Sequence, residues 1–145
     1  MGYIKIWVHL VWSTKNRQPL LTADIRKQVF DHIRENAVDK DIYIDFINGY
    51  NEHVHCLISP RSGQNIDKIL MLLKGESSFW INKNKLCLKK FEWQDEYFAV
   101  SVSESAVNRV RNYIKNQEEH HRKRSFQEEY DEFMRKYRFD KLVSG

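Results

Sequence analysis

Strand-like and helix-like segments alternate through most of the chain, and their order restricts the folds open to it more than any other feature. Alternating apolar side chains rich in β-branched and aromatic residues predict strands, and apolar residues repeated every three or four positions predict helices. The first six segments follow the order strand, helix, strand, strand, helix, strand. The predicted strands cover residues 3–13, 42–47, 52–59 and 91–102, and the predicted helices cover residues 23–38, 65–82, 104–120 and 125–137.

This order is the split βαβ pattern of ferredoxin-like folds. We therefore predict an α+β fold, a ferredoxin-like βαββαβ sandwich with one four-stranded antiparallel sheet and two additional C-terminal helices. The first two helices are expected on one face of the sheet, and the C-terminal helices are candidates to cover the other face. A length of 145 residues fits a single domain, with its core at residues 1–120 and a C-terminal helical extension at residues 121–145.

Two local expectations accompany this fold. The pair Asn48-Gly49 is typical of a tight turn between the second and third strands. In the helix over residues 65–82, Phe79 and Trp80 are expected on the buried face with the aliphatic residues.

Several classes of protein are excluded by what the sequence lacks. No apolar run approaches the ~18 residues that span a bilayer, and the N-terminal segment has no basic stretch followed by a long apolar one, as a secretory signal would. Cys56 and Cys87 are the only cysteines and lie far apart, which argues against a disulfide framework or a zinc ribbon. We therefore expect a protein of the reducing cytoplasm that does not bind a membrane.

The net charge of +4 is concentrated in two segments. Residues 61–90 hold seven basic and two acidic residues, and residues 109–145 hold ten basic and seven acidic residues. Residues 91–108, which separate them, hold four acidic residues and no basic ones. Such segments suit a phosphate backbone, although solvated helix faces would give the same pattern.

His53 and His55 occur in the third predicted strand with Val54 between them. Residues two apart on a strand point to the same face, so the two imidazoles can bind one divalent metal ion. The alternative is a pair of packed or surface histidines. Leu57 occupies the position of the third alternating histidine that a nucleotide-hydrolase triad needs, and no second His-x-Thr/Ser motif supports a two-histidine phosphodiesterase.

Tyr113 and Gln117 are four residues apart in the helix over residues 104–120 and therefore share one face. They flank the apolar stripe of that helix and are not needed to fill it. A tyrosine hydroxyl is a poor nucleophile because its pKa is near 10, but a metal ion that polarises the phosphate under attack removes much of that handicap. The Gln117 side-chain oxygen suits Mg²⁺ or Mn²⁺. The alternative for Tyr113 is ordinary packing.

His120 and His121 are followed by the basic triplet at residues 122–124. Adjacent helical side chains point about 100° apart, so these histidines are not expected to share a metal ion. They are interpreted as phosphate contacts or as a solvated helix end. The candidate contacts to a nucleic-acid backbone are Lys15, Arg17, Lys74, Lys83, Arg122, Lys123 and Arg124.

Taken together, these motifs resemble those of the HUH-type, single-tyrosine transposases of small bacterial insertion sequences, the IS200-like family, where U is a bulky apolar residue. The HUH motif is His53-Val54-His55, and the tyrosine motif is the stretch YIKNQ from Tyr113 to Gln117. The segments WSTKNR (residues 12–17), LKGESS (residues 73–78) and SVSES (residues 101–105) also resemble family sequence. The resemblance covers nearly the whole chain and keeps the motif order.

The resemblance implies an enzyme that cuts single-stranded DNA at the ends of an insertion sequence and rejoins it without ATP. Tyr113 would attack the scissile phosphate and form a 5′-phosphotyrosine, and a 3′-hydroxyl from another strand would reverse the reaction. His53, His55 and Gln117 would hold one Mg²⁺ or Mn²⁺ ion.

The resemblance also implies partners. Family members recognise DNA hairpins, so single-stranded DNA with hairpin ends is the expected ligand. They often form homodimers in which the tyrosine helix is exchanged between subunits. A symmetric pair would also suit a chain of 145 residues, which has little room for both a complete site and a DNA-recognition surface.

Two further functions remain as alternatives. The first is a non-catalytic or domesticated nucleic-acid-binding module, because ferredoxin-like sheets with exposed aromatic residues stack bases in many RNA-binding domains. Residues 52–59 carry no aromatic ring other than histidine, which counts against it. The second is a replication initiator or relaxase with the same chemistry, although such chains are usually longer.

Overall fold

The four strands pair into one antiparallel sheet with the order β2-β3-β1-β4. The computed structural model describes residues 2–139, so the last part of the expected extension, residues 140–145, lies outside the described residues. The strands are β1 (Trp7–Thr14), β2 (Ile44–Gly49), β3 (His53–Ile58) and β4 (Trp93–Val102). Central strands β1 and β3 with β2 and β4 at the edges are the arrangement of a ferredoxin-like fold, and this prediction is confirmed.

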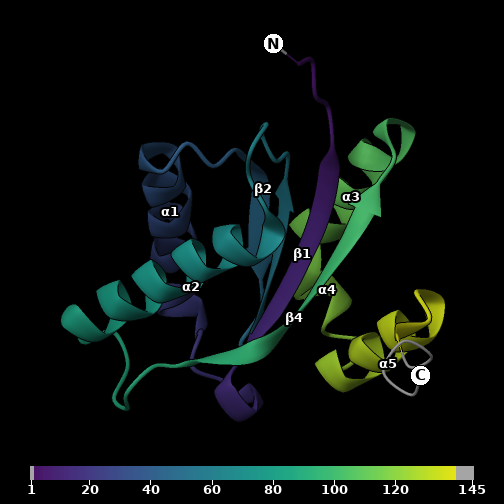
Figure 1. Cartoon of the computed structure of the whole chain (residues 1–145). Helices are drawn as coiled ribbons and strands as arrows, with labels where there is room; N and C mark the ends of the chain where they lie inside the picture. Colours follow the sequence, from purple (N-terminus) through teal and green to yellow (C-terminus); the bar gives the residue numbers. More distant parts are fainter. Residues whose placement is uncertain (1, 140–145) are drawn as a thin grey trace.

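Helices cover both faces of the sheet (Figure 1). On one face lie α1 (Ala23–Asp39) and α2 (Ile66–Lys83), which follow β1 and β3. On the other face lie α3 (Val107–Lys115), α4 (Gln117–His120) and α5 (Phe126–Lys136), all of which follow β4. The C-terminal helices therefore cover the second face, as the sequence predicts.

Alternation along the strands gives the two faces different chemistry. The face under α1 and α2 is the main apolar core, built on alternate residues of β1 and β3 that pack against both helices. These strand residues are Val8, Leu10, Trp12, Val54, Cys56 and Ile58. Burial of this surface is the main stabilising contribution to the fold.

The face under α3, α4 and α5 has two smaller apolar clusters with polar residues between them. Leu57 packs with Val107 and Ile114 in one cluster, and Val11 packs with Phe126 in the other. The polar residues between the clusters come from the same two strands and are His9, His53 and His55. This face therefore carries the polar chemistry of the molecule.

Strand β1 begins at Trp7, four residues later than the strand expected at residue 3. Trp7 pairs with Val102 and Val8 pairs with Ile58, and these partners end β4 and β3. Residues 3–6 lie beyond both partner strands and have no ladder to join, although their pattern is strand-like.

The helix expected over residues 104–120 is divided into a 3₁₀ turn at Glu104–Ala106, α3 and α4, with a break at Asn116. The Asn48 side-chain amide donates hydrogen bonds to the carbonyls of Ile114 and Lys115, at 3.0 and 3.1 Å. Side-chain donors at these carbonyls cap the end of α3. The last helix agrees with its expected bounds, and Ser125 starts it with a capping box to Glu128.

Two local expectations are wrong. Asn48 and Gly49 belong to β2, and the chain reverses at residues 50–52 instead. A Cβ at Gly49 would lie 2.1 Å from the His53 carbonyl oxygen, so the glycine permits a close approach of two strands. The second expectation is wrong only for Phe79, which is exposed because the buried stripe of α2 continues through Ser77 and Ile81, whereas Trp80 packs against the core. No helix among the described residues combines the length and apolar character needed to cross a membrane.

Candidate active site

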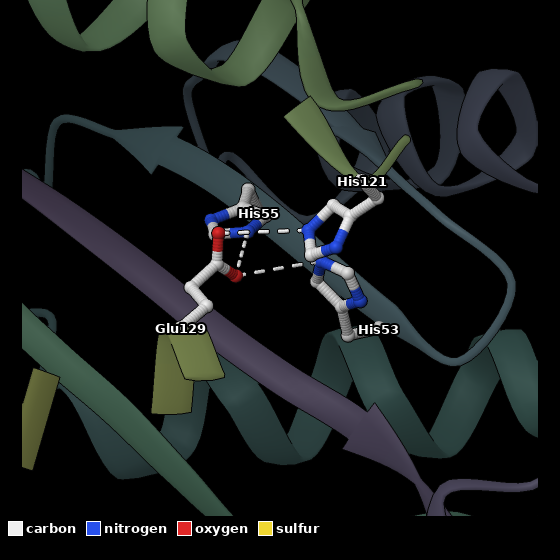
Figure 2. A group of neighbouring side chains, drawn as sticks. All are labelled: His53, His55, His121 and Glu129. Atoms are coloured by element: carbon white, nitrogen blue, oxygen red, sulfur yellow. Dashed lines mark hydrogen bonds and ion pairs between the residues drawn. The ribbon is translucent and has the colours of Figure 1, made fainter. Parts of the chain in front are cut away.

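The two histidines of β3 form the base of the candidate site. His53 and His55 are both fully buried, and their rings meet edge to face with centroids 5.0 Å apart. They project from the sheet toward α4 and α5 (Figure 2). The strand alternation that predicts a shared face thus brings both imidazoles into one enclosed space.

Two residues from the C-terminal region complete a four-residue cluster (Figure 2). They are His121, which directly follows α4, and Glu129, which lies on α5. One Glu129 oxygen, Oε1, lies 3.0 Å from His55 Nε2 and 3.6 Å from His53 Nε2. The other oxygen, Oε2, lies 3.5 Å from His121 Nε2. The ligand atoms of the four residues all lie within 4.8 Å of one another, and imidazole nitrogens with a carboxylate can hold a divalent metal ion.

The Gln117 side chain reaches the same cluster from the start of α4. Its Oε1 lies 3.2 Å from His53 Nε2 and 3.1 Å from His121 Nε2. Its amide nitrogen donates a hydrogen bond to the Tyr113 carbonyl, which turns the oxygen toward the histidines. The structure therefore brings His53, His55 and Gln117 together.

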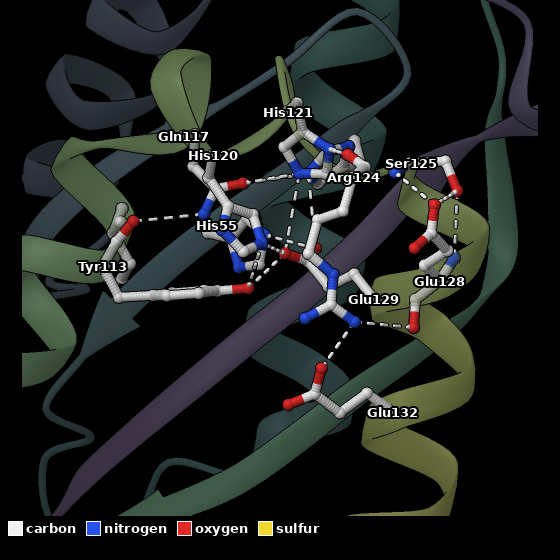
Figure 3. Close-up of polar contacts among 12 residues, drawn as sticks. His55, Tyr113, Gln117, His120, His121, Arg124, Ser125, Glu128, Glu129 and Glu132 are labelled. Carbon is white, nitrogen blue, oxygen red and sulfur yellow. Dashed lines mark hydrogen bonds and ion pairs between the residues drawn. The ribbon is translucent and has the colours of Figure 1, made fainter.

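The Tyr113 hydroxyl enters the cluster through Glu129 (Figure 3). It donates a hydrogen bond to Glu129 Oε2 and lies 3.5 Å from His120 Nε2. Burial, together with the Glu129 carboxylate, raises the pKa of Tyr113 above its ordinary value. In this arrangement the hydroxyl therefore keeps its proton at neutral pH.

Burial sets the charges around these groups. It lowers the pKa of His55 to about 4, against the opposing effect of Glu129, and the pKa of His9 to about 3. Both imidazoles are therefore neutral at pH 7, with a nitrogen lone pair available. Burial alone would raise the pKa of Glu129, but hydrogen bonds from His121 and His55 hold it below its ordinary value, so the carboxylate is ionised.

The sequence prediction for His121 is wrong. Its side chain is 2% exposed and lies in the cluster, where a solvated helix end or phosphate contact was expected. The expected divergence from His120 assumes a continuous helix, whereas α4 ends at His120. Both rings reach Glu129 Oε2, at 3.1 Å from His120 and 3.5 Å from His121.

The sequence reasoning missed His9 and Glu129. His9 lies on β1, and its Nε2 is 2.9 Å from His55 Nδ1. Its place on the polar face follows only from the pairing of β1 with β3. Glu129 offered a signal, because a carboxylate between Phe126 and Phe133 interrupts the apolar stripe of α5.

The seven basic candidates are dispersed over the surface. Lys15 and Lys74 line one pocket at the start of β4, and Lys83 lies at the end of α2. The guanidinium of Arg17 lies over the rings of Phe126 and Tyr130, where it packs against α5.

The other three basic candidates precede α5. Arg122 pairs with Glu119, Lys123 is exposed, and Arg124 pairs with Glu132 (Figure 3). Arg124 also lines the cavity beside Tyr113, together with Arg109 and Lys136, which sequence reasoning did not single out. Three cationic side chains thus line the cavity beside Tyr113, together with the carboxylates of Glu129 and Glu132.

Comparisons with known proteins identify the family of the chain. Residues 3–117 match the family model described as "Transposase IS200 like". The chain is 26% identical over 122 residues to the ISDra2 transposase TnpA of Deinococcus radiodurans, covering 80% of this chain and 87% of that protein. Glu129 and His121 lie beyond the residues that the family model matches.

Two solved structures share the fold. A crystal structure of a candidate transposase from Deinococcus radiodurans aligns with a TM-score of 0.63 at 24% identity, covering 81% of this chain and 95% of that one. A REP-associated tyrosine transposase bound to a REP hairpin aligns with a TM-score of 0.63 at 18% identity, covering 83% of this chain and 72% of that one.

Proposed function

Since the chain belongs to the family of IS200-like transposases, we propose that it cuts and rejoins single-stranded DNA with Tyr113 as the nucleophile. One observation carries the proposal. The Glu129 carboxylate touches the Tyr113 hydroxyl with one oxygen and the Nε2 atoms of His53 and His55 with the other. The nucleophile and the candidate metal ligands are therefore close enough for one phosphate group to contact both.

The proposed reaction starts when the Tyr113 hydroxyl oxygen attacks the scissile phosphorus. The bond from phosphorus to the 3′ oxygen breaks as the tyrosine bond forms, which yields a 5′-phosphotyrosine and a free 3′-hydroxyl. One proton leaves the tyrosine hydroxyl and one is gained by the 3′ oxygen, so the step balances without a further reactant. A 3′-hydroxyl from another strand reverses the step, and no ATP is needed.

The residues of the cluster have separate tasks in this scheme. His53, His55 and Gln117 would hold a Mg²⁺ or Mn²⁺ ion, which supplies Lewis-acid stabilisation of the phosphate charge when bound. Because His55 is neutral at pH 7, its ring can take the tautomer that presents an Nε2 lone pair to the ion in place of the contact with Glu129. The raised pKa of Tyr113 disfavours loss of the hydroxyl proton, so positive charge near the hydroxyl is needed for attack. The Arg124 guanidinium supplies such charge and acts to lower this pKa.

The DNA is proposed to approach Tyr113 through the cavity lined by Arg109, Arg124 and Lys136. Cationic side chains at this position can contact the phosphates on either side of the scissile bond. A DNA hairpin is the proposed ligand, since a solved structure of the same fold is bound to a hairpin. The pocket that contains Lys15 and Lys74 is a second candidate for backbone contacts.

Labelled single-stranded DNA tests the nucleophile. A Tyr113→Phe variant removes only the hydroxyl, so it should form no covalent protein–DNA adduct on a denaturing gel while hairpin binding in a mobility-shift assay stays unchanged. The control is Tyr97→Phe on β4, whose hydroxyl bonds Asp67 and which should form the adduct as the wild type does. An adduct that survives in Tyr113→Phe would remove the tyrosine from the reaction.

The same assay distinguishes the enzyme from a non-catalytic binding module, which would bind the hairpin and never form an adduct. His53→Ala removes one candidate ligand and should abolish the adduct and weaken Mn²⁺ binding. Undiminished cleavage by His53→Ala would exclude His53 from the site.

A further inference from the structure

Two side chains in the cluster lie outside the expected ligand set of His53, His55 and Gln117. They are His121 and Glu129, and both come from the region beyond residue 117. We propose that this chain builds a centre of three imidazoles and one carboxylate, from His53, His55, His121 and Glu129, that selects a first-row transition-metal ion over Mg²⁺. This inference rests on the proposed function and specifies the ion that its site takes.

The first support is the spacing of the donor atoms. Metal–ligand bonds of about 2.0–2.2 Å place neighbouring donor atoms of a tetrahedral site about 3.4 Å apart. Glu129 Oε1 lies 3.0 Å from His55 Nε2 and 3.6 Å from His53 Nε2, and Glu129 Oε2 lies 3.5 Å from His121 Nε2. The Glu129 carboxylate therefore already lies close to this spacing from all three imidazoles, and the four ligand atoms lie within 4.8 Å of one another, so small side-chain movements would bring them to one ion.

The second support is that every imidazole of the cluster is held from behind. His53 Nδ1 lies 2.7 Å from a Glu52 oxygen, and His55 Nδ1 lies 2.9 Å from His9 Nε2. In the third imidazole, His121 Nδ1 lies 3.0 Å from the Arg124 carbonyl oxygen. Metal-binding histidines almost always engage the nitrogen opposite the metal in this way, which fixes the ring and its tautomer. All three rings consequently present Nε2 to one point.

The third support is the charge of Glu129. Its side chain is 3% exposed, and all of its ion pairs within residues 2–139 are with histidines rather than lysine or arginine. A buried carboxylate without a fixed cationic partner is costly. A bound divalent ion would compensate this charge.

The donor set determines the choice of ion. Mg²⁺ prefers oxygen ligands in octahedral geometry and keeps several waters, whereas imidazole nitrogens suit zinc and other transition metals. Three imidazoles with one carboxylate oxygen therefore favour Zn²⁺ and other first-row transition-metal ions over Mg²⁺, with Mn²⁺ the weakest binder among them. Glu129 Oε2 also accepts the Tyr113 hydrogen bond, so α5 links the nucleophile to the ion.

Titration calorimetry on the metal-free full chain tests the proposal with Zn²⁺, Mn²⁺ and Mg²⁺. Zn²⁺ and Mn²⁺ should bind the wild type at least about tenfold more tightly than Mg²⁺, and Glu129→Gln and His121→Ala should each weaken Mn²⁺ binding at least about tenfold. The control is Glu132→Gln, the same change one turn along α5 at a half-exposed carboxylate that pairs with Arg124, which should leave Mn²⁺ binding unchanged.

The absorption spectrum of Co²⁺ bound to the wild type tests the ligand set even if a variant does not fold. Co²⁺ bound by three imidazoles and one carboxylate should give the intense visible absorption of a four- or five-coordinate ion, and the weak spectrum of an octahedral ion would overturn the proposal. Glu129→Asp, which keeps the charge on a shorter side chain, should fold and shift this spectrum.

Equal or tighter Mn²⁺ binding by Glu129→Gln would overturn the proposal, because the Glu129 carboxylate would then not be a metal ligand.

Failure of this proposal can be distinguished from failure of the proposed function. If Glu129→Gln and His121→Ala bind metal and form the adduct as the wild type does, only the four-ligand centre is wrong. If the wild type binds metal through these residues but forms no Tyr113 adduct, only the proposed function is wrong.

Discussion

His9 is the residue that holds His55 in position. Its Nε2 lies 2.9 Å from His55 Nδ1, and its low pKa of about 3 keeps it neutral and able to accept a hydrogen bond. With the proton on Nδ1, His55 can present the lone pair of Nε2 to a bound ion in place of its contact with Glu129 Oε1. His9 is therefore a positioning residue that supports a metal ligand from behind.

Replacing His9 tests this role. His9→Leu removes the acceptor and should weaken Mn²⁺ binding by about 10–100-fold, as expected for the loss of an outer contact to a metal ligand. Titration calorimetry measures the affinity, and circular dichroism checks the fold. The matched control is His32→Leu, a histidine that pairs with Glu76 on α2 and should not affect the metal. Equal affinities for His9→Leu and the wild type would show that His55 needs no such support.

Sequence predicts contacts between residues only where local geometry fixes them. His53 and His55 share a face because strands alternate, and Tyr113 and Gln117 lie together because a helix repeats every 3.6 residues. The places of His9 and His121 depend on strand pairing and on the end of α4. Neither follows from a local period, so the sequence pattern does not indicate the place of His9 and indicates the wrong one for His121.

The element that carries Tyr113, α3, is attached to β2 at its middle and at its C-terminal end. Arg111 donates two hydrogen bonds to the Asp45 carboxylate on β2, at 2.6 and 2.8 Å. Asn48, also on β2, caps the last carbonyls of α3. An edge strand thus fixes the position of the nucleophile above β3.

The Asp45–Arg111 pair should make part of the stability depend on pH. The hydrogen bond from Arg111 lowers the pKa of Asp45 below its ordinary value of 3.8. A carboxyl whose pKa is lower in the folded chain stabilises the fold above the unfolded pKa, and this contribution is lost as the pH falls through the folded value. Asp45→Asn should therefore lower the free energy of unfolding at pH 7, and the difference from the wild type should vanish at strongly acidic pH.

Urea unfolding at a series of pH values measures this difference. Asp31→Asn is the control, because Asp31 forms an exposed pair with Lys27 on α1 that contributes little to stability. A difference for Asp45→Asn that is the same at all pH values would show that packing around Asp45, rather than its charge, holds α3.

The type and order of the elements were predictable, because each long segment has a clear hydrophobic period. Where an observed element boundary differs from the expected one, contacts with residues elsewhere in the chain set the observed position. Residues 3–6 extend beyond the ends of β3 and β4, and the break at Asn116 follows a cap supplied by Asn48. Such effects arise from tertiary contacts and leave no mark in the local pattern.

At the scale of the whole molecule, the two faces of the sheet divide stability from chemistry. The face under α1 and α2 is apolar, whereas the other face buries histidines under α3, α4 and α5. The C-terminal helix α5 closes this second face with Phe126 and supplies Glu129 to the cluster. Because burial of the apolar face stabilises the fold, the opposite face of the sheet can accommodate buried polar groups.

This arrangement bears on the subunit composition of the site. A homodimer is expected from the sequence, with exchange of the tyrosine helix between subunits as one of its two possible arrangements. In the described chain, Tyr113, the two β3 histidines and Glu129 all converge within one subunit. We therefore predict that each site is completed by its own chain, whether or not the protein pairs in solution.

Mixing two inactive variants distinguishes the arrangements. Tyr113→Phe lacks the nucleophile and His53→Ala lacks a candidate ligand, so neither should form an adduct alone. If one chain supplies the whole site, their co-expressed mixture stays inactive, because every site carries one of the two defects. If the tyrosine helix is exchanged, a mixed dimer has one intact site and adduct formation returns. Light scattering on the same mixture shows whether dimers are present, so restored activity in dimers would establish a shared site.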